Sequence, residues 1–266
     1  MSVLRPLAVV TVAVALAVAA TLAPAGSADA VRPHWRVTMK ADRTTVQVGK
    51  KIHFTGKVSR AAAGRLVMLQ EKVGPGRRWR NQRNAVVHRD GTYRTYDRPT
   101  VNRVRSYRVV MPATKHRKRG ISPTVRVVVY AWQSLTSRPF VNQSYLFVEP
   151  SVAINAQSFP SSLEGYMYDP QYDTTQSIEY NLDHQCTKFR GTFGLADDSE
   201  TAGAATIVAS ADGKAWFTQT FSLGQSAPGP TTWTTPPLKI RFESTSLNSG
   251  AMGLGAVGTP EVYCTQ

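Results

Sequence analysis

The sequence predicts an all-β protein made of two β-sandwiches in series. Several segments alternate apolar and polar residues with a period of two, and turn signals separate them. Beyond the apolar N-terminus, we find no convincing helical period. The charge also changes sharply along the chain: residues 31–131 hold 25 Lys/Arg and 4 Asp/Glu, whereas residues 132–266 hold 6 and 12. We place a domain boundary at that change.

Residues 1–30 have the three parts of a secretory signal peptide. Arg5 precedes an apolar run at 6–23, and Ala28 and Ala30 form a small-x-small cleavage site. An uncleaved membrane anchor is the alternative, because the run is marginally long enough to span a bilayer. We expect cleavage, and therefore a secreted or cell-envelope-associated protein with no membrane span.

Residues 31–131 form the first predicted sandwich. Strands are expected at 51–58, 106–111 and 124–130, where apolar residues alternate with polar ones. Roughly seven short strands in about a hundred residues are typical of an immunoglobulin-like sandwich. The stretches "RTTVQVGKKIHFTGKVS", "AAAGRLVMLQEKVGPGRRWR", "RDGTY" and "RSYRVVM" resemble bacterial Ig-like modules of secreted actinobacterial-type proteins. That resemblance implies a spacer or an adhesive stalk.

Residues 132–266 form the second predicted sandwich. Apolar strands are expected at 177–183, 188–195, 205–210, 215–221, 237–243 and 260–264. Asp212-Gly213 lies between two apolar runs, which is a strong signal for a two-residue hairpin turn. Strands without helices predict a sandwich here too, of the jelly-roll kind.

This second half resembles a known module. The order "SIEYNLDHQCTKFRGTFGLADD", "ATIVASADGKAWF", "LKIRFEST" and "AVGTPEVYC" is similar to NPCBM, the carbohydrate-binding module first noted beside family 98 glycoside hydrolases. The stretches "WQSL" and "VAINAQSFPSSL" fit its beginning. Where family members often have a longer glycine-rich loop, this chain has the short "SETAGA". The resemblance implies a galactose-binding-like jelly roll.

The adjacent carboxylates Asp197 and Asp198 are the first candidates for chemistry. On an extended strand, neighbouring side chains point to opposite faces, so this pair should not converge on one glycosidic bond. Together with Glu200 they could instead offer clustered oxygens to a structural calcium ion. A polar loop that closes a strand is the third interpretation, and we favour it.

Aromatic side chains are the candidates for sugar binding, because the apolar face of a sugar stacks on a flat ring. Trp216 follows the predicted hairpin, but Trp216 and Phe217 are consecutive and should face opposite ways. We therefore favour core packing for Trp216. Better candidates lie in loops: Tyr166, Tyr168, Tyr172 and Trp233.

The two cysteines, Cys186 and Cys264, should form a disulfide, because an even pair outside the cytoplasm is more often bonded than free. His184 lies two residues before Cys186. With a second cysteine available for a bond, we do not expect a Cys–His nucleophile there.

Two basic stretches are the candidates for contact with an anionic polymer: Arg77, Arg78 and Arg80, and Lys115, Arg117, Lys118 and Arg119. Arginine and lysine neutralise phosphates or carboxylates. For an exported protein, an envelope polymer such as teichoic acid is a better match than nucleic acid. A generally basic surface is the alternative.

The sequence therefore predicts a non-catalytic binding protein. The C-terminal jelly roll would recognise a polysaccharide or cell-wall glycan with its loops, and the basic domain would act as a stalk. A charge-driven binder of an anionic envelope polymer or nucleic acid, with a structural jelly roll, is the main alternative. A polysaccharide hydrolase is a weaker one, because no hydrolase or metalloprotease motif is present. We expect no cofactor other than the candidate calcium ion.

Overall fold

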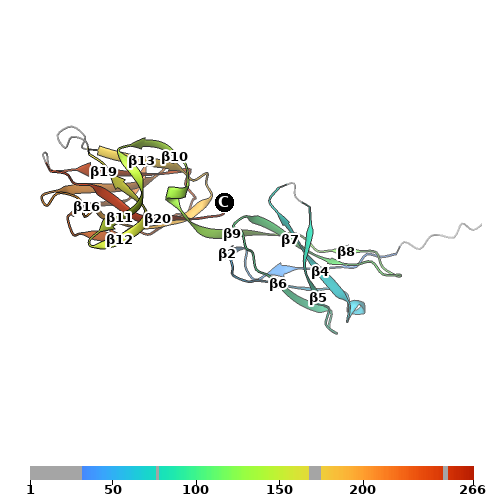
Figure 1. Cartoon of the computed structure of the whole chain (residues 1–266). Coiled ribbons are helices and arrows are strands. Elements are labelled where there is room, and N and C mark those ends of the chain that lie inside the picture. Colours follow the sequence, from blue (N-terminus) through green and yellow to red (C-terminus); the bar gives the residue numbers. More distant parts are fainter. Residues whose placement is uncertain (1–31, 76–77, 168–174, 248–250) are drawn as a thin grey trace, which may run out of the picture.

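A computed structural model describes residues 32–75, 78–167, 175–247 and 251–266 (Figure 1). The described chain consists of strands and two short 3-10 turns, so the predicted all-β class is confirmed. No helix in the described ranges is long and apolar enough to cross a membrane. The signal peptide prediction falls on residues 1–30, which lie outside these ranges.

The N-terminal half contains two sheets. One sheet has the order β1-β3-β6, and the other contains β2, β9, β7, β4 and β5, with β8 paired to β7. The elements are β1 (Lys40–Ala41), β2 (Thr45–Gln47), β3 (Ile52–Lys57), η1 (Arg60–Ala62), β4 (Leu66–Val73), β5 (Arg80–Val86), β6 (Thr92–Asp97), β7 (Val104–Met111), β8 (Gly120–Ile121) and β9 (Val125–Ser134).

The core of this half contains buried side chains that recur at every second position of its strands. Ile52 and Phe54 of β3 face Tyr107 and Val109 of β7, as the period-two pattern predicts. The ring centroids of Phe54 and Tyr107 lie 4.7 Å apart. The burial of these apolar side chains is the main favourable free energy of the half.

A buried polar network interrupts the apolar core. Arg105 of β7 forms an ion pair with Glu71 of β4, and both side chains are less than a tenth exposed. The Tyr107 hydroxyl donates a 2.7 Å hydrogen bond to Asp97, and the Gln82 amide donates to Glu71. Burial, followed by the hydrogen bond to Asp97, raises the pKa of Tyr107. A buried charge without a partner is strongly destabilising, so loss of one member of this network should destabilise the fold.

The C-terminal half also contains two sheets. One has the order β10-β13-β19-β15-β16, and the other is built on β11, β12, β20 and β14, with β17 and β18 paired to β14. The elements are η2 (Leu135–Ser137), β10 (Phe140–Ser144), β11 (Leu146–Ile154), β12 (Gln157–Gly165), β13 (Thr175–Asn181), β14 (Cys186–Leu195), β15 (Ala204–Ala211), β16 (Lys214–Ser222), β17 (Ser226–Pro228), β18 (Thr231–Thr232), β19 (Lys239–Ser246) and β20 (Gly255–Cys264).

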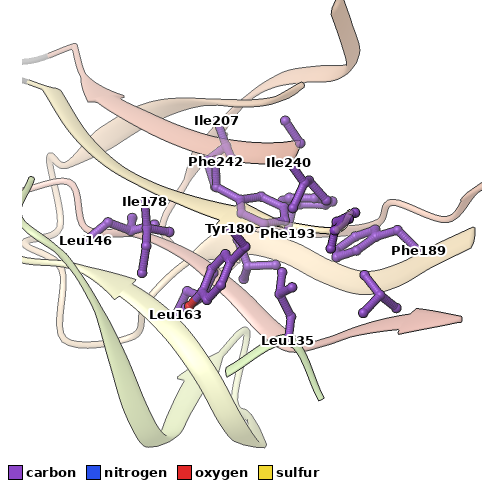
Figure 2. Close-up of a cluster of buried hydrophobic side chains, with 14 of the residues drawn as sticks. Leu135, Leu146, Leu163, Ile178, Tyr180, Phe189, Phe193, Ile207, Ile240 and Phe242 are labelled. Carbon is purple, nitrogen blue, oxygen red and sulfur yellow. The ribbon is translucent and has the colours of Figure 1, made fainter. Parts of the chain in front are cut away.

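The core of the C-terminal half lies between its two sheets. Figure 2 shows Tyr180 of β13 and Phe242 of β19 pointing toward Phe189 and Phe193 of β14 and Leu163 of β12. All are buried. Strands distant in the sequence alternate within each sheet, as in a jelly roll rather than a simple meander.

A single strand, β9, belongs to both halves (Figure 1). Its first part pairs with β7 and β2 of the N-terminal half, and its last four residues pair with β20 of the C-terminal half. The two sheets therefore form one continuous hydrogen-bonded ladder. The predicted boundary at residue 131 falls inside this strand, and the division into 31–131 and 132–266 stays a prediction.

The predicted hairpin at Asp212-Gly213 is present between β15 and β16, and both residues have positive φ (48° and 78°). One expectation next to it is wrong. Trp216 and Phe217 do not face opposite ways: both pack on the core. A β-bulge shifts the register between Ala209 and Ser210, so the alternation of side chains is lost there.

The predicted disulfide is confirmed. Cys186 opens β14, Cys264 closes β20, and the two residues pair directly across the strands. Cys264 also pairs with Ala131 of β9. The bond therefore fixes the ends of β14 and β20 to each other, next to the point where β9 joins the C-terminal sheet.

Candidate functional site

A hollow of about 300 Å³ on the C-terminal half brings carboxyl and aromatic side chains together. Phe147 and Glu149 come from β11, Glu164 from β12, and Asp198 from the turn after β14. The register pairs Phe147 with Glu164 directly, because the two residues are opposite each other in the antiparallel ladder. Tyr166 lies just beyond the end of β12 and completes the wall.

The Glu164 carboxyl is the most perturbed acid in the hollow. Partial burial raises its pKa to about 8, and a side-chain hydrogen bond with Asp198 and the negative charges of Asp198 and Glu149 act in the same direction. Near neutral pH, Glu164 therefore stays protonated, and its carboxyl O–H donates a hydrogen bond to Asp198. A carboxyl group that stays protonated beside a carboxylate supplies both a donor and an acceptor.

The aromatic part of the hollow is exposed. The Tyr166 side chain is 54% exposed and that of Phe147 is 39% exposed. Their rings meet edge to face with centroids 6.3 Å apart. The backbone N–H of Tyr166 donates a 2.7 Å hydrogen bond to the carbonyl of Tyr145, which holds this position at the end of the strand. Exposed rings of this size beside polar groups are typical of ligand contact rather than of core packing.

A buried amide lies directly behind the hollow. Gln176 of β13 is completely buried, and neither atom of its amide has a hydrogen-bond partner in the described part of the chain. Gly165, which lines the hollow, separates the two: a Cβ at Gly165 would lie 2.6 Å from Oε1 of Gln176. Gln176 itself does not line the hollow, and the missing side chain at Gly165 gives its amide room on the core side of β12. A buried polar group without a hydrogen-bond partner costs free energy.

The calcium prediction is not supported, because the three acids do not converge. Asp197 accepts a 2.8 Å hydrogen bond from the N–H of Ala156, Asp198 contacts Glu164, and Glu200 accepts one of 3.0 Å from Met252. Within the described ranges, no group of three or more His, Cys, Asp or Glu side chains could hold a metal ion. Asp197 and Asp198 lie in a turn, not on a strand. The strand argument therefore does not apply to them, although their two carboxyls contact different groups.

The other predicted aromatic residues lie elsewhere. Trp216 and Trp233 meet edge to face, with centroids 5.6 Å apart, beside a second hollow of about 350 Å³. Trp216 also packs on Phe189 and Phe242, so most of its surface stabilises the core. Tyr168 and Tyr172 lie outside the described residues. Of the candidate sugar-binding residues that the structure describes, Tyr166 lines the carboxyl-lined hollow, and Trp216 and Trp233 do not.

The predicted basic residues that are described lie on the N-terminal half. Lys115, Arg117, Lys118 and Arg119 occupy the loop between the antiparallel strands β7 and β8. Arg78 and Arg80 flank Trp79, and the guanidinium of Arg108 lies 4.1 Å from the centroid of that ring. Partial burial, followed by the charge of Arg119, lowers the pKa of Arg108. Arg77 lies outside the described residues.

Sequence reasoning missed Phe147, Glu149 and Glu164. Strands β10, β11 and β12 were not predicted individually, because "FVNQS" and "QSFPSSLEG" show no clean alternation. The available signal was the sequence "EGYMY", in which Glu164 lies two residues before Tyr166, a spacing that puts both side chains on one face of a strand. The register of the β11–β12 hairpin was needed to place Phe147 beside that acid.

The chain was compared with known proteins. No protein-family model matches the sequence, and no curated protein matches it significantly. Two solved structures that it resembles are carbohydrate-binding modules. TmCBM61 in complex with β-1,4-galactotriose has a TM-score of 0.29 and 10% identity, over 51% of this chain and 88% of that chain. CBM36 in complex with calcium and xylotriose has a TM-score of 0.28 and 13% identity, over 50% and 98%. TM-scores this low indicate neither the ligand nor the site of this chain.

Proposed function

We propose that this chain is a secreted, non-catalytic glycan-binding protein whose C-terminal half holds a sugar in the hollow between Phe147, Tyr166 and the Glu164–Asp198 pair. The exposed rings of Phe147 and Tyr166 beside a carboxyl pair that shares a proton are the observation that carries the proposal. The apolar C–H face of a sugar packs on such rings, and the hydroxyls bond to the carboxyls. We further propose that this half is of the NPCBM type and that the basic half is an Ig-like stalk.

The contact between the two carboxyls argues against hydrolysis. Glycosidases hold their two carboxyl groups roughly 5 to 9.5 Å apart across the bond that they cut. Glu164 and Asp198 are hydrogen-bonded to each other, so no scissile bond fits between them. The pair is therefore better suited to recognising hydroxyls than to acid–base catalysis.

The experiment is a glycan-array screen of the full chain, followed by affinity measurements on the best neutral glycan. Tyr166→Ala should weaken binding at least about tenfold, because it removes the larger exposed ring. The matched control is Phe140→Ala, since Phe140 is 49% exposed on β10 of the opposite sheet. Equal losses in the two variants, or release of reducing ends from the glycan by the wild-type chain, would refute this function.

A second candidate function is favoured by a separate observation. In the described part of residues 32–131, only two carboxylates form ion pairs with Lys or Arg, Asp42 with Arg43 and Glu71 with Arg105. The remaining basic side chains leave a strongly positive surface, which attracts anionic polymers. A contact of the basic half with an anionic envelope polymer is therefore the second candidate.

A further inference from the structure

Two hollows lie on either side of Tyr130, at the junction of the two halves. Tyr130 is on β9 and lines both. The first hollow, of about 450 Å³, lies between β2 and its neighbouring loops on one side and β14 and β20 on the other. The second, of about 660 Å³, lies between β7, β9 and the C-terminal residues. Both hollows therefore contain residues from the two halves of the chain.

The walls of these hollows are basic. Arg43, Lys50 and Lys188 line the first, and the second contains three further cations: Lys72, Arg103 and Arg126. Among the described residues that line the two hollows, none is Asp or Glu. Arg43 is paired with Asp42 at 3.1 Å, whereas the other five have no carboxylate within 4 Å in the described part of the chain.

An aromatic stack separates the two hollows. The rings of Tyr130 and Tyr263 lie parallel with centroids 5.1 Å apart, and Trp132 packs on the other side of the junction at 5.1 Å from Tyr263. The Lys188 ammonium lies 5.6 Å from the centroid of Tyr263. Burial and the neighbouring Tyr130 raise the pKa of Tyr263, so its hydroxyl stays protonated and can donate a hydrogen bond.

The shared strand fixes this arrangement. Tyr130 lies one residue before the point where β9 changes its partner from β2 to β20. Period-two alternation puts Val128, Tyr130 and Trp132 on the same face of β9. Tyr263 lies opposite Trp132 and Lys188 lies opposite Tyr263, so these side chains share one face of a continuous sheet. The other cations line the two hollows from neighbouring strands and loops.

We infer that this junction is a binding site for an acidic polysaccharide, a sugar chain that carries negative charge on its repeating units. The cations on both sides neutralise its charges, and the tyrosine stack contacts its sugar rings. A single-stranded nucleic acid fits less well, since such strands stack successive bases on separate exposed rings. Here Tyr130 and Tyr263 stack on each other. The inference does not depend on the Glu164 hollow.

The test uses the full chain and two acidic polymers, polygalacturonate (carboxylate) and dextran sulfate (sulfate), with neutral dextran and oligo(dT) as comparisons. The variant Lys50→Glu/Lys188→Glu should weaken binding of the acidic polymers at least about tenfold at low salt and flatten the salt dependence. The matched control is Lys40→Glu/Lys57→Glu, which changes net charge equally at exposed positions of β1 and β3 that line neither hollow. It should retain most of the affinity.

Three outcomes of these binding measurements would overturn the inference. Equal losses in the two double variants would mean that general charge drives binding. Binding of neither acidic polymer, or tighter binding of oligo(dT), would exclude an acidic polysaccharide. The variant Tyr263→Leu should lower the affinity for the acidic polymers without changing how steeply that affinity falls with salt. An unchanged affinity would show that the Tyr130–Tyr263 stack does not contact the polymer. Glu164→Gln should bind the acidic polymers as the wild type does, which separates this site from the proposed glycan hollow.

Discussion

Removal of the Cys186–Cys264 disulfide tests the description of the C-terminal half most directly. The bond joins residues 78 apart. In the chain-entropy relation, a closed loop of that length lowers the entropy of the unfolded chain by an amount worth about 4.5 kcal/mol at 25 °C. Alanine is the replacement of choice because both cysteines are completely buried. Cys186→Ala/Cys264→Ala should therefore lose about 3 to 5 kcal/mol of unfolding free energy.

The loss should be confined to one half of the molecule. The loop runs from β14 to β20, and the N-terminal core from Trp35 to Val129 lies outside it. Calorimetry and hydrogen exchange resolved by strand would measure this: the amides of β14 and β20 should exchange faster, whereas those of β3 and β7 should change little. A loss below about 1 kcal/mol, or equal acceleration in both halves, would refute the reasoning.

Three further predictions concern single side chains. Glu71→Ala should destabilise the N-terminal half by about 3 to 5 kcal/mol, because it leaves buried Arg105 unpaired. In denaturant unfolding, Glu71→Met/Arg105→Met should recover most of the lost free energy of unfolding. No recovery would contradict the conclusion that the unpaired charge of Arg105 causes the loss. The pKa of Glu164 is raised to about 8 in the folded state, so the stability that Glu164 adds is fully present below its ordinary pKa and is lost as the pH rises through 8. Glu164→Gln should flatten the pH dependence of the melting temperature between about pH 5 and 8, and an unchanged pH profile would refute this. Trp216→Ala should lower the free energy of unfolding by about 2 to 4 kcal/mol and leave the glycan affinity unchanged, since the ring packs on the core. A loss of affinity without destabilisation would show instead that Trp216 contacts the glycan.

Much of the fold could be predicted from the sequence, because local patterns specify local structure. The alternation in β3, β7 and β19 and the turn at Asp212-Gly213 depend only on neighbouring residues. The disulfide could be predicted from the number of cysteines and their expected compartment. The opposite facing of Trp216 and Phe217 was wrong because a β-bulge is set by the partner strand.

The candidate site could be predicted only in part. Tyr166 and Asp198 were both singled out as residues, but nothing in the sequence places them in the same hollow. Their proximity results from the order β11-β12-β20-β14, which pairs strands far apart in the chain. The raised pKa of Glu164 is also a product of that order, since Asp198 and Glu149 come from different segments. The junction was missed for a related reason: the change of charge near residue 131 suggested a domain boundary, whereas the chain continues there as β9.

The strand shared by both halves also affects how the protein would bind a long polymer. Two domains on a flexible linker bind with an effective concentration set by linker length, and they adapt to many spacings of the ligand. Here β9 is paired on both sides of residue 131, so the spacing between the cations of the two halves is set by the sheet. Avidity should then depend on the distance between successive charges along the polymer. A polymer whose charges repeat at the matching distance would bind the cations of both halves at once and with higher affinity. A polymer of equal charge but different repeat distance would bind the cations of one half only.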